Sequence, residues 1–402
     1  MKKRNMLFIA HSYSNFQKES IDSVAKYFNK CSVLIESNPI AEISNYINIP
    51  YLKQFNLNYK IDLSGSPVNV NVQTTPMLYA PLDSQYKKLG EKHLKKVEQK
   101  ISETNIDFDI IHSHFTWSSG YVGAKLKEKY NVPFVVTAHG FDIYLLPFKD
   151  EEWKEKIEYV LNSADHIITV SKSNLRCIEK LNVRSPVSQI PNGFNSNLFY
   201  PRDPIKCRKY LNLPLDKKII VSVGNLVEVK GHKYLIQSIK SMVESRSDIQ
   251  CYIVGWGRLD KKLRKLIDKL GLRNHVKLVG GKPHNEIPYW MNACDLFVLP
   301  SLRESFGVVQ IEALACGKPV VATHNGGSEE IIVSEDYGIL VEPGNYDDLS
   351  KKIDLALNKK WDTKSILNYS NKFKWDIVAA EVHQIYEDVE TKLTKGDYKL
   401  LQ

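Results

Sequence analysis

The stretch PSLRESFGVVQIEALA at residues 300–315 decides the fold, because it joins the end of an apolar run to the start of a helix. The run at 295–300 ends at Pro300 and predicts a β-strand followed by a loop. A helix starting near Gly307 would carry Glu312 in its second turn, with Glu304 in the loop before it. Both carboxylates would then point into one pocket beside the positive end of this helix. A ligand site is therefore predicted where this strand ends.

The type of ligand follows from what carboxylates can bind. A pair of carboxylates can hold a metal ion, but no third oxygen or histidine ligand lies at close spacing to Glu304 and Glu312. Ionised carboxylates only accept hydrogen bonds, so they suit the hydroxyl groups of a sugar and a ribose better. The alternative is that both are solvated charges on either side of an apolar helix face, and the stretch alone leaves this open.

Working outward, short apolar runs alternate with longer amphipathic segments along almost the whole chain. Strands are predicted at 6–10, 108–114, 134–139, 166–171, 218–224, 249–255, 276–279, 295–300 and 319–323. Helices are predicted at 151–163, 234–244, 259–270 and 347–357. Most strand runs are continuously apolar, as in parallel strands covered on both faces by helices. The pattern predicts an α/β protein with two doubly wound, Rossmann-like parallel sheets.

The domain boundary is predicted near residues 200–204, where two prolines interrupt the pattern. This gives an N-terminal domain at 1–200 and a second domain at 201–372. Residues 40–82 contain several prolines and are expected to form loops or short strands on the first sheet.

A second candidate site lies at residues 222–231, SVGNLVEVKG. Gly224 at the strand exit would let the backbone approach a ligand, and Lys230 would stand beside the N-terminus of the next helix. A lysine at a helix N-terminus suits an anion such as a diphosphate. The spacing is not that of a Walker loop. A tight turn with a surface lysine is the alternative.

Together these motifs resemble the retaining glycosyltransferases of family 4. The resemblance rests on Glu304-x7-Glu312 with Phe306-Gly307, on Gly224-x5-Lys230-Gly231, and on Gly326-Gly327-x-x-Glu330, Pro191-Asn192-Gly193 and Gly255-x-Gly257. It implies the GT-B fold, in which two Rossmann-like domains face each other with the active site between them. It also implies that a last helix, at 373–390, crosses back to the first domain.

The resemblance assigns roles to matching positions. Lys230, near Gly224, would bind the donor diphosphate, Glu304 the donor sugar and Glu312 the ribose. The remaining positions are Phe306, the backbone of Gly307, Val308 and Val309 beside the sugar and phosphate, Lys282 in the turn that recognises the base, and His139 beside the reacting carbon. Three positions depart from the family pattern: Asn225 replaces an arginine, Asn195 replaces an aspartate, and residues 11–15 replace a glycine pair.

Composition excludes several other classes of protein. The 402 residues are 43% hydrophobic with a net charge of +9, which is ordinary for a globular chain. The basic residues form no tail or arm typical of nucleic-acid binding. No apolar run approaches the roughly 18 residues of a membrane span, and residues 1–10 do not resemble a signal peptide. Six widely spaced cysteines without C-x-x-C spacing predict free thiols in a reducing cytoplasm.

Two further features keep alternatives open. His112 and His114 could both reach one zinc ion, but no third ligand is nearby in sequence, and an acceptor-side or structural role is favoured. The segment at 86–101 is a lysine-rich amphipathic helix that would either contact an anionic membrane or be merely solvated.

We therefore expect a cytoplasmic GT-B enzyme that moves a sugar from a nucleoside-diphosphate sugar to a glycan or lipid-linked sugar, with retention. It is expected to need no cofactor and no metal, and to bind no nucleic acid. The alternatives are a non-catalytic GT-B protein that binds sugars or nucleotides, and an NAD-dependent dehydrogenase, for which G-x-G-x-x-G is missing. Base, sugar, acceptor and oligomeric state cannot be predicted from the sequence.

Overall fold

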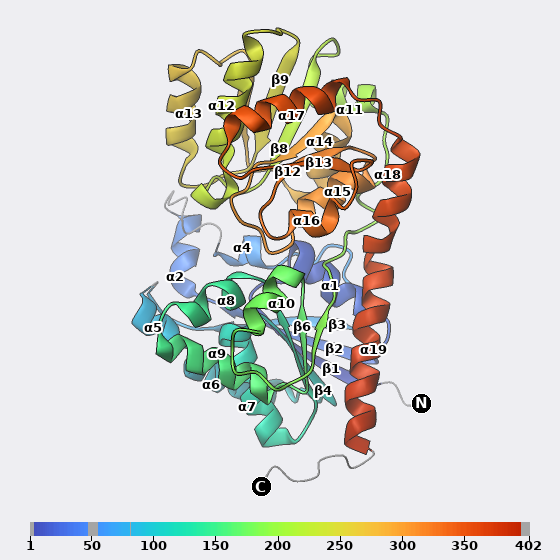
Figure 1. Cartoon of the computed structure of the whole chain (residues 1–402). Coiled ribbons are helices and arrows are strands. Elements are labelled where there is room, and N and C mark those ends of the chain that lie inside the picture. The colour runs from blue at the N-terminus through green and yellow to red at the C-terminus, as the bar shows by residue number, and fades with distance from the viewer. Residues whose placement is uncertain (1–3, 47–54, 81, 395–402) are drawn as a thin grey trace. The chain divides into compact units, whose positions relative to one another are not determined.

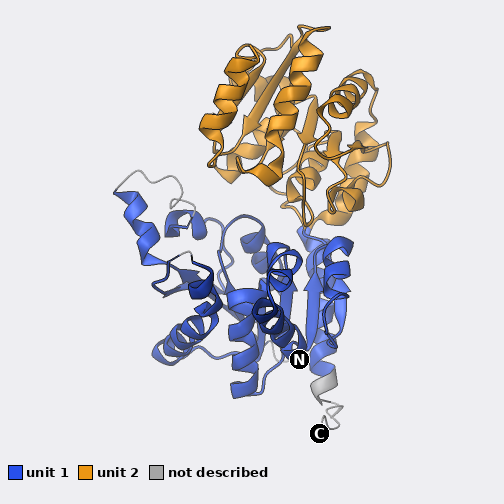
Figure 2. Cartoon of the chain, turned by 60° about the vertical axis from the view of Figure 1, so that its left-hand side comes forward, with its two compact units in different colours: residues 1–192, 375–402 blue, residues 193–374 orange. Residues whose placement is uncertain are grey.

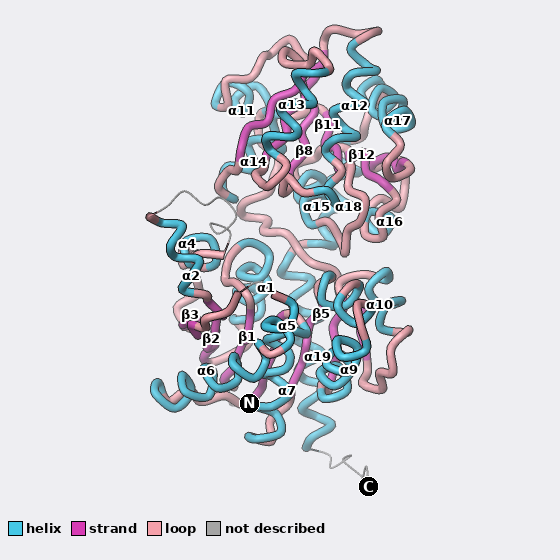
Figure 3. The backbone as a smooth tube through the Cα atoms, turned by 90° about the vertical axis from the view of Figure 1, so that its left-hand side faces the viewer, coloured by secondary structure: helices cyan, strands magenta, loops and turns pink. Residues whose placement is uncertain are grey.

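The computed structural model describes residues 4–46, 55–80 and 82–394. It divides into two compact units (Figure 2): Met1–Asn192 with Trp375–Gln402, and Gly193–Lys374. Each unit contains one parallel sheet with helices on both faces (Figure 3), as the alternating pattern predicts.

The first sheet has seven strands in the order β3-β2-β1-β4-β5-β6-β7. Their bounds are β1 Asn5–Ala10, β2 Lys30–Ser37, β3 Val70–Pro76, β4 Ile110–His114, β5 Phe134–Ala138, β6 His166–Thr169 and β7 Val187–Gln189. The described pairs are parallel, with Ile9 opposite Ser113 and His114 opposite Thr137. This register brings the carboxyl ends of β1, β4 and β5 together, and β1 and β4 can be followed next to one another in Figure 1.

Side chains that alternate along the strands form two cores, one on each face of this sheet. Met6 and Phe8 pack in one cluster with residues of α1 and α19, whereas Leu7 and Ile9 pack in the other. The covering helices are α1 Asn15–Ala25 and α19 Trp375–Thr394, and on the other face α6 Leu89–Thr104, α7 Tyr121–Tyr130 and α9 Glu151–Ser163. The shorter helices of this unit are α2 Pro39–Glu42, α4 Leu57–Lys60, α5 Asp83–Lys87, α8 Phe141–Tyr144 and α10 Lys172–Ile178.

The second sheet has six strands in the order β10-β9-β8-β11-β12-β13. Their bounds are β8 Lys218–Val223, β9 Ile249–Val254, β10 Val276–Gly280, β11 Leu296–Leu299, β12 Val320–Thr323 and β13 Gly338–Val341. The helices are α11 Pro204–Tyr210, α12 His232–Val243, α13 Asp260–Lys269, α14 Ile287–Ala293, α15 Val308–Ala315, α16 Ser328–Ile331, α17 Tyr346–Asn358 and α18 Thr363–Ser370. Leu235, Leu263 and Ile353 from α12, α13 and α17 share one core with the strands.

The C-terminal helix α19 belongs to the first unit. Val378, Val382 and Tyr386 are buried on one of its faces, at the spacing of successive helical turns, and they pack in the same core as α1. The chain enters the second unit after Asn192 and leaves it after Lys374.

Several strands lie within one or two residues of their predicted positions, and β3 falls in the 40–82 segment where loops or short strands were expected on the first sheet, but β2, β7 and β13 were not predicted. The strand β2 reads KCSVLIES, so its apolar run is short and is followed by the polar Glu36. Glu36 is nevertheless buried. All six cysteines are free and buried, as expected. Among the described residues, none of the helices has both the length and the apolar character that crossing a bilayer requires.

Candidate active site

At the carboxyl ends of β8 and β11, two chain segments touch through their backbones. Gly231 has a φ of +64° and ends the short helix η4 (Glu228–Lys230). A Cβ atom at this position would lie 1.9 Å from the carbonyl oxygen of Pro300, so only glycine fits. The approach is reinforced by a hydrogen bond of 2.7 Å from the Leu302 N–H to the Val229 carbonyl. Lys230 is thereby held against the loop that follows β11.

In this arrangement Lys230 and Glu304 form an ion pair. The Lys230 ammonium lies 2.5 Å from Glu304 Oε1, and the Ser301 hydroxyl donates to the same oxygen at 2.7 Å. The side chains of Lys230 and Glu304 are 25% and 10% exposed. Both residues were predicted from separate motifs, and the structure brings them into direct contact. Ser301 was not among the predicted residues, although it follows Pro300 directly.

The helix α15 begins directly after this cluster and presents an uncapped N-terminus. Gly307 is its N-cap with a φ of +88°, and no side chain caps the first turn. Phe306 before it is buried and packs against the edge of Phe373, with ring centroids 5.9 Å apart. The backbone N–H groups of Val308 and Val309 lie in this first turn, where the helix dipole favours an anion or an oxygen atom.

Glu312 lies in the second turn of α15, as predicted, but its partner was not foreseen. Its carboxylate is buried, and Oε1 lies 3.3 Å from Nε2 of His284 in the short helix η5 (His284–Glu286). His284 directly follows the predicted base-recognition turn at 281–283. This position in the sequence is the signal that could have identified His284 as a site residue. Lys282 in the same turn forms an ion pair of 3.1 Å with Glu286.

Gly224 stands at the exit of β8 as predicted. A Cβ atom there would lie 3.7 Å from Lys230 Cδ and 3.8 Å from His232 Nε2, so the glycine lies directly beside the lysine stem. Burial, with Lys230 next to it, lowers the pKa of His232 to about 4. The imidazole is therefore neutral at pH 7. Asn225, where the family pattern has arginine, is exposed and adds no charge.

In the first unit, His139 lies directly after β5. It is 8% exposed, and its Nε2 is 2.9 Å from Nδ1 of His114 at the end of β4, so one ring donates to the other. Burial holds the pKa of His139 well below its usual value, and the neighbouring His114 and His11 act in the same direction. The loop behind it is fixed by Asp142, whose carboxylate accepts from the backbone N–H groups of Gly140 and Thr116 at 2.8 Å.

His112 has a different role from its neighbour His114. Its two ring nitrogens lie 2.6 Å from the Tyr386 hydroxyl of α19 and 2.8 Å from the Thr137 hydroxyl. Among the residues that the structure describes, no group of three or more His, Cys, Asp or Glu side chains is placed to hold a metal ion. His112 therefore connects β4 with α19, which is the structural role weighed above.

The lysine-rich segment forms the helix α6, and its apolar side chains are not available to lipid. Leu89, Val97 and Ile101 are buried in the core of the first unit. Insertion of an amphipathic face into a membrane is therefore the wrong interpretation. The exposed lysines of the helix leave only a surface electrostatic contact, which stays a prediction.

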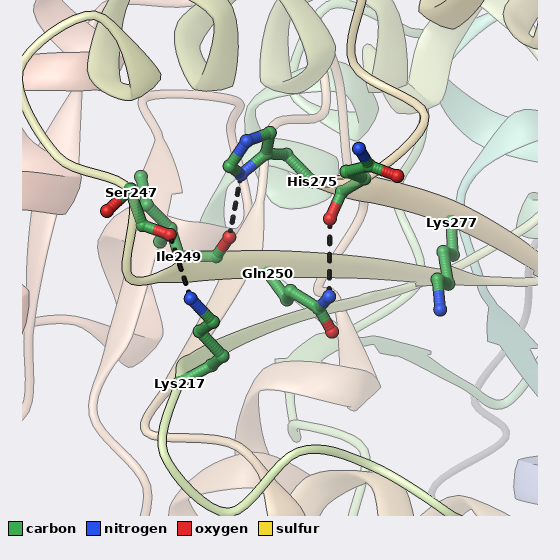
Figure 4. Close-up of a pocket in the computed structure, with 7 residues that line it drawn as sticks. Lys217, Ser247, Ile249, Gln250, His275 and Lys277 are labelled. Atoms are coloured by element: carbon green, nitrogen blue, oxygen red, sulfur yellow. Dashed lines mark hydrogen bonds between the residues drawn. The ribbon is translucent and has the colours of Figure 1, made fainter.

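A hollow of about 330 Å³, whose lining residues are drawn in Figure 4, lies near the amino ends of β8, β9 and β10. It is lined by Lys217, Ser247, Ile249, Gln250, Asn274, His275 and Lys277. Its polar side chains bond to backbone carbonyls: Lys217 to Ser247, Gln250 to Asn274 and His275 to Ile249, at 3.1–3.2 Å. These residues are near the amino ends of β8, β9 and β10, away from the motif residues, and their bonds stabilise the sheet edge.

Comparison with known families finds matches in both units. The family described as "Glycosyl transferases group 1" matches residues 205–373, and "Glycosyltransferase Family 4" matches residues 64–198. An uncharacterized glycosyltransferase of Methanocaldococcus jannaschii is 32% identical over 298 residues, which cover 73% of this chain and 79% of that protein. A D-inositol 3-phosphate glycosyltransferase of Corynebacterium jeikeium is 27% identical over 318 residues, which cover 73% of this chain and 76% of that protein.

Solved structures agree on the fold. Sucrose-phosphate synthase from Thermosynechococcus elongatus superposes with a TM-score of 0.77 at 21% identity, covering 97% of this chain and 100% of that one. Anabaena HepE in complex with UDP has a TM-score of 0.73 at 23% identity, covering 96% and 100%. At this level of identity the likeness establishes the architecture of two parallel-sheet units, and the residues of the site are argued from their own contacts.

Proposed function

Because the chain belongs to the glycosyltransferases of group 1 and family 4, with the GT-B fold, we propose that it takes a sugar from a nucleoside-diphosphate donor. Family membership makes the chain an enzyme that transfers sugars. In the proposed reaction, the bond between the anomeric carbon and the diphosphate oxygen breaks, and a hydroxyl oxygen of a glycan or lipid-linked sugar bonds to that carbon with retention. The nucleoside diphosphate leaves with the electron pair of the broken bond, and the proton of the acceptor hydroxyl passes to the departing diphosphate oxygen.

The observation that carries this proposal is the contact between Lys230 and Glu304 beside the uncapped start of α15. An ammonium and the first N–H groups of a helix stabilise the negative charge that grows on a departing diphosphate. When a diphosphate binds the Lys230 ammonium, the ion pair between Lys230 and Glu304 breaks. The Glu304 carboxylate can then accept hydrogen bonds from sugar hydroxyls, with Ser301 still orienting it.

The nucleoside would be bound by residues further along α15. Glu312 is buried and acceptor-only, which suits the two hydroxyls of a ribose, and His284 orients one of its oxygens. The backbone of the 281–283 turn would face the base. HepE of Anabaena has been solved with UDP and with UDP-glucose, so uridine nucleotides are the first donors to test. His139 stays a prediction for the contact beside the reacting carbon.

Two further parts of the proposal concern metal and location. Lys230 and the helix N–H groups would neutralise the leaving group, so transfer should proceed without a divalent metal ion. Six free, buried thiols are consistent with a reducing compartment, and we place the enzyme in the cytoplasm, where an electrostatic contact with a membrane surface would remain peripheral.

The test begins with a panel of UDP-, GDP- and ADP-sugars and the full chain. A donor at 100 times its dissociation constant should stabilise the protein by about 2.7 kcal/mol, which thermal unfolding detects. The donor that binds should then be hydrolysed slowly to free nucleoside diphosphate, with EDTA present, and proton NMR should show the configuration of the released or transferred sugar. An absence of stabilisation and of diphosphate release across the panel would refute the proposal.

A further inference from the structure

The hollow at the amino ends of β8, β9 and β10 lies at the other end of these strands from Gly224 and Lys230. The strand β8 has 6 residues, and at about 3.3 Å per residue it separates the two places by roughly 20 Å. The hollow is therefore not part of the candidate active site. Its volume of about 330 Å³ falls at the lower end of the range of small-molecule sites, which is roughly 300–1,000 Å³.

The side chains around this hollow give it a positive charge. Lys217 stands directly before β8 and Lys277 lies in β10, on either side of β9, which carries Gln250 (Figure 4). None of the lining residues is acidic. We call this hollow the basic hollow, and it is lined by Lys217, Ser247, Ile249, Gln250, Asn274, His275 and Lys277.

Hydrogen bonds hold the walls of the basic hollow in place. The His275 ring donates from Nδ1 to the Ile249 carbonyl at 3.1 Å. The Gln250 amide donates to the Asn274 carbonyl at 3.2 Å, and its oxygen accepts from the Tyr252 hydroxyl. These bonds join the start of β9 to the start of β10. A ligand would therefore meet side chains that are already ordered, which lowers the entropy cost of binding.

The two lysines have no acidic partner within the part of the chain that the structure describes. Lys277 is exposed, and it forms neither a hydrogen bond nor an ion pair there. Lys217 donates to the Ser247 carbonyl at 3.2 Å and forms no ion pair there. Since a carbonyl oxygen carries no formal charge, both positive charges remain for an anion.

The acidic residues that are close to the basic hollow in sequence do not supply this missing charge. Asp248, beside the start of β9, accepts from the Arg246 guanidinium at 2.8 and 2.9 Å. Arg246 also donates to Asp354 at 2.6 Å, so these charges compensate one another. Asp216 precedes Lys217 in the chain, but it is exposed and does not line the hollow.

We propose that the basic hollow binds the phosphate group of a small soluble phosphate ester of about the size of a sugar phosphate. Phosphate oxygens accept charge-assisted hydrogen bonds from ammonium groups, and these are stronger than bonds between neutral groups. The Ser247 hydroxyl and the Asn274 amide line the same hollow and can bond hydroxyl groups of the same molecule. This second anion site is separate from Lys230 and does not depend on the proposed transfer reaction.

A phospholipid headgroup carries the same phosphate chemistry, but the lining favours a soluble molecule. Ile249 is the only apolar residue among those that line the basic hollow, and it is buried in the core of the second unit. No apolar side chain of the lining is therefore available to enter a bilayer beside a bound headgroup. The experiments below test both sources of phosphate.

The first experiment measures binding to the full chain by isothermal titration calorimetry, with glucose 6-phosphate, inorganic phosphate and methyl glucoside as probes. Salt is kept at about 0.1 M, where attraction between distant charges is screened beyond about 10 Å. We expect glucose 6-phosphate to bind at least about tenfold more tightly than methyl glucoside, equally with and without UDP. Equal affinities for the charged and the uncharged sugar would overturn the proposal.

The second experiment removes the two cations one at a time. Lys277→Ala should lower the affinity for glucose 6-phosphate about tenfold and leave the melting temperature unchanged, because no described contact is lost. Lys217→Gln removes the charge, keeps an amide donor for the Ser247 carbonyl, and should lower the affinity by a similar factor. The matched control is Lys240→Ala, which removes an exposed lysine paired with Glu244 at 3.1 Å and should leave the affinity unchanged.

Three outcomes would show that the proposal is wrong. If Lys240→Ala weakens binding as much as Lys277→Ala does, the ligand responds to net charge and not to the basic hollow. If UDP displaces glucose 6-phosphate and Lys230→Ala abolishes its binding, the anion occupies the candidate active site. If vesicles of phosphatidylglycerol bind the chain through Lys277 while no soluble phosphate binds, the ligand is a lipid headgroup.

These results are independent of the proposed function. If glucose 6-phosphate binds at Lys277 but no nucleoside-diphosphate sugar binds the chain, the proposed function fails and this inference stands. If a nucleoside-diphosphate sugar binds and is hydrolysed but Lys277→Ala and Lys217→Gln bind glucose 6-phosphate normally, this inference fails and the proposed function stands.

Discussion

At the strand ends of the second unit, formal charges meet in pairs, whereas at the corresponding edge of the first unit buried neutral rings meet. Lys230 contacts Glu304 and remains partly exposed. His114 contacts His139 without a formal charge on either ring, and both are buried. Both sheets are parallel and doubly wound, so the topology alone does not decide which ligand is bound.

The difference follows from the cost of burial. A charge removed from water is stable only when it is paired, and a diphosphate brings the countercharge that a lysine needs. An imidazole adapts by staying neutral, and it can then offer one donor and one acceptor to a hydroxyl group. In the proposed reaction, the strand ends of the second sheet would stabilise the charge that develops as the diphosphate leaves.

The sharpest test of this contrast is Glu304→Ala. Positive character develops at the reacting carbon as the diphosphate departs, and losing a comparable preorganised contact costs about 2.7–4 kcal/mol in turnover. We expect kcat to fall by about a hundredfold or more while donor binding changes modestly. Glu244→Ala, which removes an exposed ion pair with Lys240 at the C-terminal end of α12, is the matched control and should leave kcat unchanged. Full turnover of Glu304→Ala would remove this residue from the site.

Mild acid should separate the two units by stability. Burial lowers the pKa of His93 to about 4 and of His114 to about 3 in the first unit, while His232 is the corresponding case in the second. The unfolded chain binds these protons near pH 6.5, so the stability these histidines contribute is full above that pH and falls as the pH drops toward 4. At pH 5.5 the loss is on the order of 1 kcal/mol for each such histidine.

Hydrogen exchange at pH 7.0 and 5.5, corrected for intrinsic rates, measures this loss for each unit. The first unit should lose more protection because His11, His112 and His139 add to the effect, although Asp142, whose pKa burial raises, opposes it. His93→Gln should reduce the pH dependence. Equal losses in the two units would show that the buried imidazoles do not distinguish them.

Lys230→Ala tests whether the lysine at the strand ends of the second sheet binds the diphosphate. It removes a charge-assisted contact worth roughly 1.5–3 kcal/mol, so the affinity for nucleoside diphosphate should fall about tenfold or more. Calorimetric titration measures the affinity, and assays with EDTA and then with added magnesium or manganese test the role of metal. Activity that disappears with EDTA and returns with a divalent ion would contradict the assignment of charge stabilisation to Lys230 and the α15 N–H groups.

The candidate site at the carboxyl ends of the strands in the second sheet was largely predictable, because most of its residues lie close together in sequence. Residues 300–315 contain the strand end, the loop carboxylate and the helix start in one run, and Gly231 marks the turn beside Lys230. The contact between Lys230 and Glu304 joins residues 74 positions apart and depends on Gly231 lying against the Pro300 carbonyl. Spacing within one motif does not contain that information.

The contacts at the carboxyl ends of the strands in the first sheet were much less predictable, because they join residues of different strands. The pair of His114 and His139 depends on the register of β4 with β5, which the sequence does not state. The strand β2 was missed, and with it the buried Glu36 that pairs with Lys60. Polar residues such as Ser32 and Glu36 weaken the apolar signal of β2, so the pattern did not predict this strand.

The smallest effect is expected for the two residues assigned to the nucleoside. The ribose does not change charge during transfer, so Glu312 would bind the ground state and the transition state equally. Removing such uniform binding raises KM and spares kcat. Glu312→Ala should therefore weaken binding of both the donor and the free nucleoside diphosphate by about tenfold, in line with the loss of one or two hydrogen bonds.

His284→Ala should act in the same direction by about two- to threefold, because its contact with Glu312 is 3.3 Å long and the side chain is 27% exposed. KM, kcat and diphosphate affinity should be measured in both single variants and in the double variant, which together form a double-mutant cycle. If the histidine acts by orienting the carboxylate, the double variant should lose no more affinity than Glu312→Ala alone. Additive losses would mean that His284 contacts the nucleotide independently, and an unchanged diphosphate affinity in Glu312→Ala would show that the ribose is bound elsewhere.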